Sequence, residues 1–225
     1  MMIEYKGHSC FRLKDFQDTG YKIILDPYKA GSVPGYKPLD YKEERANIIL
    51  CSHEHDDHHG IEDVQLVKED IENPFDIEII DSYHDPEKGA LRGSNKIHII
   101  TLRKTGEKVV HYGDVGENIE DLLTDENIAK LKNADYALVP IGGVYTYDAN
   151  QAIELIEKTT PNHAIVMHYK STSWKCGYDH IGTVEDFLVT AMENCHEVQM
   201  AKYTYIDTYE DVIPCEIMCL QPQYI

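Results

Sequence analysis

Residues 50–60 read Leu-Cys-Ser-His-Glu-His-Asp-Asp-His-His-Gly, a stretch that crowds four histidines and three acidic residues after the apolar triplet 48–50. Neutral imidazole and carboxylate groups are natural ligands for transition-metal ions. Side chains two residues apart on an extended segment point the same way, so His53 and His55 could reach one ion. Asp57 and His58 follow at the turn and are displaced enough to serve a second ion. The spacing His-x-His-x-Asp-His therefore predicts a metal site.

Other interpretations of this stretch fit less well. A histidine-rich purification tag would be terminal and monotonous, and a solvated loop would not need to follow a buried strand. The zinc-protease pattern His-Glu-x-x-His is absent, because Glu54 is followed directly by His55. We expect Glu54 and Asp56 to face solvent or neighbouring backbone, and His59 to begin the next helix.

Three more candidate ligands each follow an apolar segment that predicts a strand: His84, Asp114 and His168. Together with the 53–58 pattern, they resemble the ligand signature of the metallo-β-lactamase superfamily. Shorter matches occur at Gly7-His8-Ser9, Asp26-Pro27, Arg92-Gly93-Ser94-Asn95 and residues 140–149. These resemble a subgroup of small metal-dependent hydrolases that includes the ascorbate-6-phosphate lactonases. The matches run from Gly7 to Tyr169, whereas residues 170–179 follow no pattern of the subgroup.

The resemblance implies an α/β fold, a four-layer αββα sandwich with the metal site at one edge between two sheets. It implies that His53, His55 and His84 hold a first ion, that Asp57, His58 and His168 hold a second, and that Asp114 bridges them. Zinc is the metal we expect first, with manganese, iron and nickel as alternatives, since all accept this ligand set. A hydroxide between two such ions is a strong nucleophile at neutral pH.

Residues around these ligands receive roles by the same resemblance. Asp57 and Asp114 are expected to act in catalysis, with His8 protonating a leaving group or contacting substrate. Asp26 is expected to orient a ligand imidazole, and Arg92 and Tyr145 to line the substrate pocket. Structural roles stay open: His8 as a loop histidine, Asp26 as a turn residue before Pro27, and Arg92 as a tie within the loop 82–95.

We therefore predict a binuclear metal-dependent hydrolase of a small anionic metabolite: a lactone, a phosphoester or a cyclic phosphodiester. A di-iron oxidoreductase and a non-catalytic metal-binding protein on the same fold are the alternatives. The formal net charge of −19, from 40 acidic and 21 basic residues, disfavours nucleic acid and anionic membranes as partners. The start of the chain has no signal-peptide pattern, and we expect a cytoplasmic protein with reduced cysteines. A homo-oligomer stays open.

The elements that must position these residues are mostly short strands, and one domain over residues 1–225 is the simplest assignment. Strands are predicted at 3–5, 10–13, 21–25, 47–51, 77–80, 96–102, 108–112, 136–141, 164–168, 198–206 and 212–220, with 47–52 as an inner strand of its sheet. Helices are predicted at 60–70, 118–131, 149–158 and 184–194. Asp148 with Gln151, and Thr183 with Asp186, predict capping boxes at the last two helices.

Overall fold

The strands of this protein form two main sheets in a computed structural model that describes residues 1–68, 70–211 and 215–225. The five-stranded sheet has the order β13 (Tyr205–Asp207), β1 (Met2–Gly7), β2 (Cys10–Lys14), β3 (Lys22–Leu25) and β5 (Ile48–Leu50). The seven-stranded sheet has the order β12 (Val198–Met200), β14 (Ile217–Cys219), β11 (His163–Met167), β10 (Tyr136–Pro140), β9 (Glu107–His111), β8 (Ser94–Leu102) and β7 (Phe75–Tyr83).

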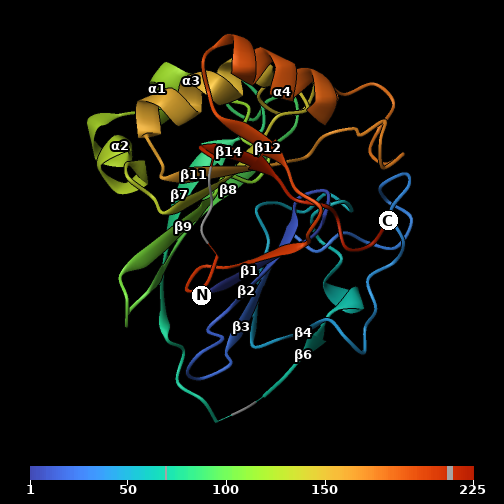
Figure 1. Cartoon of the computed structure of the whole chain (residues 1–225), viewed down its shortest axis with the longest axis vertical. Helices are drawn as coiled ribbons and strands as arrows, with labels where there is room; N and C mark the ends of the chain where they lie inside the picture. Colours follow the sequence, from blue (N-terminus) through green and yellow to red (C-terminus); the bar gives the residue numbers. More distant parts are fainter. Residues whose placement is uncertain (69, 212–214) are drawn as a thin grey trace.

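The α-helices cover the seven-stranded sheet, and the five-stranded sheet lies on its other side (Figure 1). These helices are α1 (Ile119–Leu122), α2 (Asp125–Leu131), α3 (Ala149–Thr159) and α4 (Val184–Glu193). A short parallel pair, β4 (Arg45–Ala46) and β6 (Gln65–Leu66), and the 3₁₀ helix η1 (Ile61–Asp63) belong to the N-terminal part. Buried apolar residues from both sheets and from the helices form one large core, which fixes the sheets against each other.

Helix boundaries follow the predicted caps. The Asp148 side chain accepts a hydrogen bond from the Gln151 N–H, and the Gln151 side chain accepts one from the Asp148 N–H, so this capping box is confirmed. Thr183 caps α4 by accepting from the Asp186 N–H, but its hydroxyl donates to the Asp186 carboxylate in place of the reciprocal backbone bond. Among the described residues, no helix has the length and apolar character needed to cross a membrane.

Several predicted elements were wrong. The helix at 60–70 is only the single turn η1, because Val64 is extended and Gln65–Leu66 pairs with β4. The helix at 118–131 is split into α1 and α2, since Thr124 caps a new helix start. The segment 198–206 supplies two strands, β12 and β13, to different sheets. Of the strand predicted at 212–220, residues 217–219 form β14, and 212–214 lie outside the described residues.

The strand before the histidine-rich loop also differs from its prediction. Within the described part of the chain, β5 lies at the edge of the five-stranded sheet and pairs in parallel with β3. Its residues Ile48, Ile49 and Leu50 are only half-buried. Parallel pairing brings the carboxyl ends of β3 and β5 side by side, so the residues that follow these two strands meet at one edge of the sheet.

Candidate metal centre

The seven predicted ligand residues lie together at the edge between the two sheets. The loop after β5 carries His53, His55, Asp57 and His58 from the five-stranded sheet. The seven-stranded sheet contributes the residues that follow β7, β9 and β11, close to the carboxyl ends of these strands: His84, Asp114 and His168. Together with His8, they form three overlapping groups, within each of which the possible ligand atoms lie within 4.8 Å of one another: His53, His55 and His84; His53, His58 and Asp114; and His8, Asp57, His58 and His168.

Asp114 occupies the centre of this arrangement. Its Oδ2 atom lies 3.1 Å from Nε2 of His58, of His84 and of His168, and 3.9 Å from Nε2 of His53. The backbone N–H of Asp114 donates to Asn95 Oδ1 at 2.9 Å, and the Asn95 amide is fixed in turn by Tyr112 O and Ser82 Oγ. Gly113 allows this approach, because a Cβ atom there would lie 2.4 Å from Asn95 Oδ1.

Several buried polar atoms of this site lack a hydrogen-bond partner, and a metal ion could serve as their partner. Within the described residues, the buried atoms without a hydrogen-bond partner include Nε2 of His53, His58 and His168, Oδ1 of Asp114, and Nδ1 of His84 and His168. Buried polar atoms without partners are costly, and a cluster of them aimed at one place indicates a missing partner. Imidazole nitrogens with carboxylate oxygens are the donor set that zinc and similar ions accept.

The charges around His58 also indicate a site for a cation. Burial opposes a charge on this imidazole, but Asp114, Asp57 and Asp26 outweigh burial and raise the pKa of His58 well above its usual value. His53, which burial dominates, has its pKa lowered to about 3. Burial raises the pKa of Asp114, but His168 and His58 outweigh it and hold that pKa well below the usual range. The carboxylates of Asp114, Asp57 and Asp26 therefore favour a positive charge at the position of His58.

A network beneath the loop sets the orientation of two ligand imidazoles. Asp26 is fully buried, and it accepts the Ser52 N–H through Oδ1 at 2.6 Å and the Ser52 hydroxyl through Oδ2 at 2.6 Å. His58 Nδ1 donates to Asp26 Oδ2 at 2.8 Å, and His53 Nδ1 donates to Ser52 Oγ at 2.9 Å. Each imidazole thus holds a proton on Nδ1, so that a metal ion replacing any proton on Nε2 would meet the lone pair of that atom. The position predicted for Asp26, next to a ligand imidazole, agrees with this geometry.

Asp57 is held from two sides. His8 Nε2 and the Tyr178 hydroxyl both lie 3.2 Å from Asp57 Oδ2. His8 is fully buried in the turn between β1 and β2, and its carbonyl accepts the N–H of His168 at 3.0 Å. Burial lowers the pKa of His8 to about 4, so its ring is neutral at pH 7 and donates from Nε2. His8 therefore contacts one candidate ligand, Asp57, through its side chain and another, His168, through its backbone.

Backbone strain concentrates at the same place. His8, Asp26 and His168 have φ values of 54°, 42° and 50°, in the left-handed region that non-glycine residues rarely adopt. Such conformations persist only where the surroundings over-determine them, and they cluster at functional sites. Here each residue turns its side chain from the end of a strand into the cluster.

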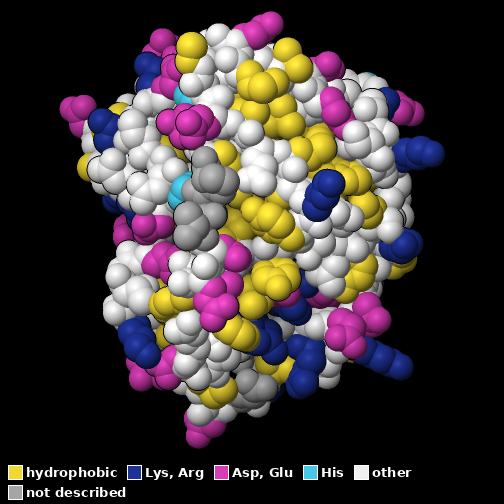
Figure 2. All heavy atoms as spheres, in the orientation of Figure 1, with side chains coloured by type: hydrophobic (Ala, Val, Ile, Leu, Met, Phe, Trp, Pro, Cys, Tyr) yellow, Lys and Arg dark blue, Asp and Glu magenta, His cyan; other side chains and the backbone are white. Residues whose placement is uncertain are grey.

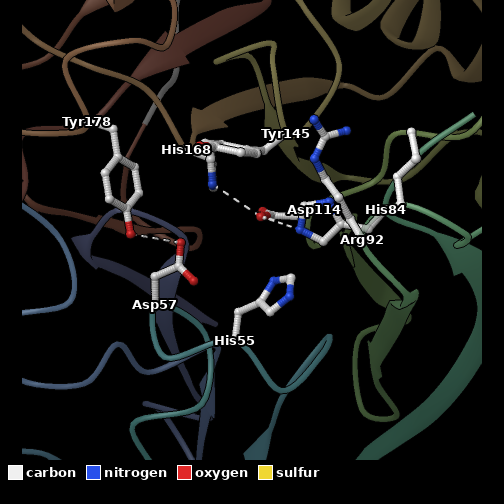
Figure 3. A pocket seen from close by; sticks show the side chains of 9 residues that line it. His55, Asp57, His84, Arg92, Asp114, Tyr145, His168 and Tyr178 are labelled. Carbon is white, nitrogen blue, oxygen red and sulfur yellow. Dashed lines mark hydrogen bonds and ion pairs between the residues drawn. The ribbon is translucent and has the colours of Figure 1, made fainter.

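The cluster opens into a cavity of about 400 Å³ (Figure 3). His55, Asp57, His84, Asp114 and His168 line it, together with Leu91, Arg92, Tyr145 and Tyr178. The Arg92 guanidinium lies over the Tyr145 ring, 5.2 Å from its centroid, and the Tyr145 hydroxyl is 2.7 Å from His180 Nε2. The loop that carries Arg92 is closed by Asp85, whose carboxylate accepts four backbone N–H groups, including that of Arg92 at 2.7 Å.

Tyr178 and Asp85 were not predicted from the sequence. Tyr178 lies in the segment 170–179, where a bridge between Ser171 and Cys176 turns the chain back and Gly177 leaves no room for a Cβ atom against Tyr169 O. Only the resulting loop geometry brings its hydroxyl to Asp57. Trp174 of the same segment packs into the hydrophobic clusters, and His59 lies in a loop ahead of η1, where a helix start was predicted.

Comparison with known proteins agrees with this site and fold. Residues 2–168 match the family model described as a beta-lactamase superfamily domain. A UPF0173 metal-dependent hydrolase of Thermofilum pendens is 30% identical over 201 residues, covering 75% of this chain and 83% of the relative, and one of Staphylothermus marinus is 27% identical. A Thermotoga maritima structure of the metallo-β-lactamase superfamily has a TM-score of 0.68 at 24% identity over 97% of each chain, which confirms the predicted fold. The chain therefore belongs to the metallo-β-lactamase superfamily and, within it, to the UPF0173 metal-dependent hydrolase family.

Proposed function

We propose that this protein is a binuclear metal-dependent hydrolase of a small anionic metabolite. The observation that carries the proposal is the convergence of seven ligand residues, four of them with unpartnered buried ligand atoms, at the base of an open cavity. In this proposal His53, His55 and His84 hold one ion, Asp57, His58 and His168 hold the other, and Asp114 serves both. Zinc is the first choice for imidazole and carboxylate ligands, and manganese, iron and nickel are the alternatives.

The chain's own residues prepare this site for hydrolysis. Divalent ions bound there would supply Lewis-acid chemistry and lower the pKa of water toward neutrality. Asp26 keeps the Nδ1 proton of His58 away from the ligand face, and His8 with Tyr178 orients Asp57. Tyr178 also lines the cavity, and its hydroxyl is held between Ser32 O at 3.0 Å and Asp57 Oδ2 at 3.2 Å.

The preference for an anionic small molecule rests on the cavity wall. Arg92 presents a planar guanidinium suited to a carboxylate or phosphate, and Tyr145 supports it by stacking. Nucleic acid is a poorer candidate, because the net charge is −19 and basic side chains are interspersed with acidic ones on the face in Figure 2. A phosphorylated lactone, a phosphomonoester and a cyclic phosphodiester are the substrate classes to try first.

Metal analysis of untagged protein, followed by a hydrolysis screen of lactones, phosphomonoesters and phosphodiesters, tests this proposal. We expect about two ions per chain and hydrolysis that a chelator abolishes and metal restores. A protein that binds no metal after reconstitution would refute the assignment. So would activity that persists after complete metal removal.

The Arg92 assignment has its own test. Arg92→Ala should raise KM for a charged substrate by a factor that corresponds to about 1.5–3 kcal/mol, the free energy of a hydrogen bond to a charged group. The metal content should stay unchanged. Arg92→Lys should recover only part of the loss, since an ammonium is a point charge. An equal change in KM for an uncharged analogue would mean that Arg92 acts only by holding its loop together.

A further inference from the structure

A second cavity, of about 470 Å³, adjoins the metal centre; we call it the side cavity. It shares His55 and Arg92 with the first cavity, so these two side chains lie between them. The other residues that line it and matter here are Glu54, His59, Ser94 and Lys96. We propose that the side cavity binds a second anionic group of the substrate, so that the substrate carries one anion at each end.

The charges of the side cavity favour an anion. Arg92 and Lys96 both line it, against the single carboxylate of Glu54. This two-to-one excess of basic residues reverses the balance of the whole chain, which has 21 basic and 40 acidic residues. Among the described residues, neither Arg92 nor Lys96 forms an ion pair within 4.0 Å; Asp81 lies opposite Lys96 in the β7–β8 register but does not line the side cavity. Two cations facing one hollow would attract an external anion.

The two cations are also fixed relative to the metal centre through the backbone. The N–H of Lys96 donates to Ser52 O at 3.0 Å, and Ser52 is the residue that links Asp26 to His53. The N–H of Arg92 donates to the carboxylate of Asp85, the neighbour of His84. Each cation therefore starts from a backbone position that is tied to the candidate metal centre.

This geometry selects a class of substrate. A molecule with one anionic group can use only the first cavity and Arg92, whereas an elongated dianion can place its second carboxylate or phosphate near Lys96. The inference rests on the proposed function only in assigning the first anion to the metal centre. Recognition of the second anion requires no hydrolysis, so it can be measured by binding alone.

Calorimetric titration of the metal-loaded protein with linear dicarboxylates, from succinate to adipate, tests the side cavity. Each is compared with the monocarboxylate of the same chain length, from butyrate to hexanoate. We expect at least one dicarboxylate to bind more tightly than its partner. Lys96→Ala should lower that affinity ratio about three- to fivefold, the upper range for an exposed ion pair. Glu54→Gln should raise the ratio about twofold, because it removes the opposing charge.

Lys202→Ala provides the matched control, since Lys202 is exposed and lines neither cavity; its ratio should equal that of the wild type. The proposal is overturned if no dicarboxylate is preferred, or if Lys96→Ala leaves the ratio unchanged. Changes of the same sign in Lys96→Ala and Glu54→Gln would also overturn it, because opposite charges cannot then be the cause. A Lys96-dependent preference without hydrolysis of any screened compound would instead leave the side cavity standing and count against the proposed function.

Discussion

Asp26→Asn should weaken metal binding while changing almost no volume. Asparagine tolerates the left-handed backbone at this position, where φ is 42°. The fixed Ser52 N–H requires an oxygen at Oδ1, which directs the new amide group toward His58 Nδ1. His58 must then accept at Nδ1 and carry its proton on Nε2, the atom that faces the cluster. Loss of such an orienting partner typically costs 10- to 100-fold in metal affinity, or roughly 1.4–2.8 kcal/mol.

Competition with a coloured chelator measures this affinity, with unfolding of the metal-free proteins as the check on the fold. Asp15→Asn is the matched control: Asp15 is also buried, and its Oδ2 accepts the N–H and hydroxyl of Thr19 at 3.0 and 2.8 Å. It should cost stability without changing metal affinity. Unchanged affinity in a folded Asp26→Asn protein, or an equal loss in Asp15→Asn, would refute the proposed control of the His58 proton.

Other predictions follow from single contacts. Asp114→Ala should empty at least one metal position and remove most hydrolysis, whereas His98→Ala should leave metal content and turnover nearly intact; equal losses would indicate damage to the fold. Tyr178→Phe should lower metal affinity about 10-fold in the chelator assay, while Tyr145→Phe, whose hydroxyl contacts His180, should not; equal values would remove Tyr178 from the support of the site. Burial raises the pKa of Glu117 from 4.5 to about 7, so the folded state holds this proton more tightly than the unfolded state. The contribution of Glu117 to the free energy of unfolding should therefore fall as pH rises from about 4.5 to 7, by at most about 3 kcal/mol, and urea unfolding of Glu117→Gln at several pH values should lack this contribution. If the free energy of unfolding changed with pH equally in Glu117→Gln and in the wild type, Glu117 would not be the source of this pH dependence.

The ligand residues could be predicted from sequence because each has a local signal. His53, His55, Asp57 and His58 form one compact pattern, and His84, Asp114 and His168 each come after a strand that its own residues predict. Resemblance to the order of ligands in the superfamily placed these three residues with the 53–58 pattern, and the meeting of strand ends at a sheet edge explains why they converge in the structure.

The supporting contacts had no such signal. Tyr178 reaches Asp57 across 121 positions of the chain, and Lys96 meets the loop after β5 only because two sheets pack against each other. The edge position of β5 depends on which strands pair, and this is decided by contacts distant in sequence. Short-range periodicity also failed at 60–70, where pairing of β6 with β4 overrides the helix-like spacing.

The division of the ligands between two sheets has a consequence for how the protein is made. On the ribosome, the loop that carries His53 to His58 emerges long before His168, and β1 cannot acquire its neighbour β13 until residue 207 has been synthesised. A nascent chain therefore exposes a histidine-rich segment while most of its partners do not yet exist. If these residues hold metal as proposed, capture by the complete set must wait until His168 has emerged, so metal loading would be a late event in the synthesis of the chain.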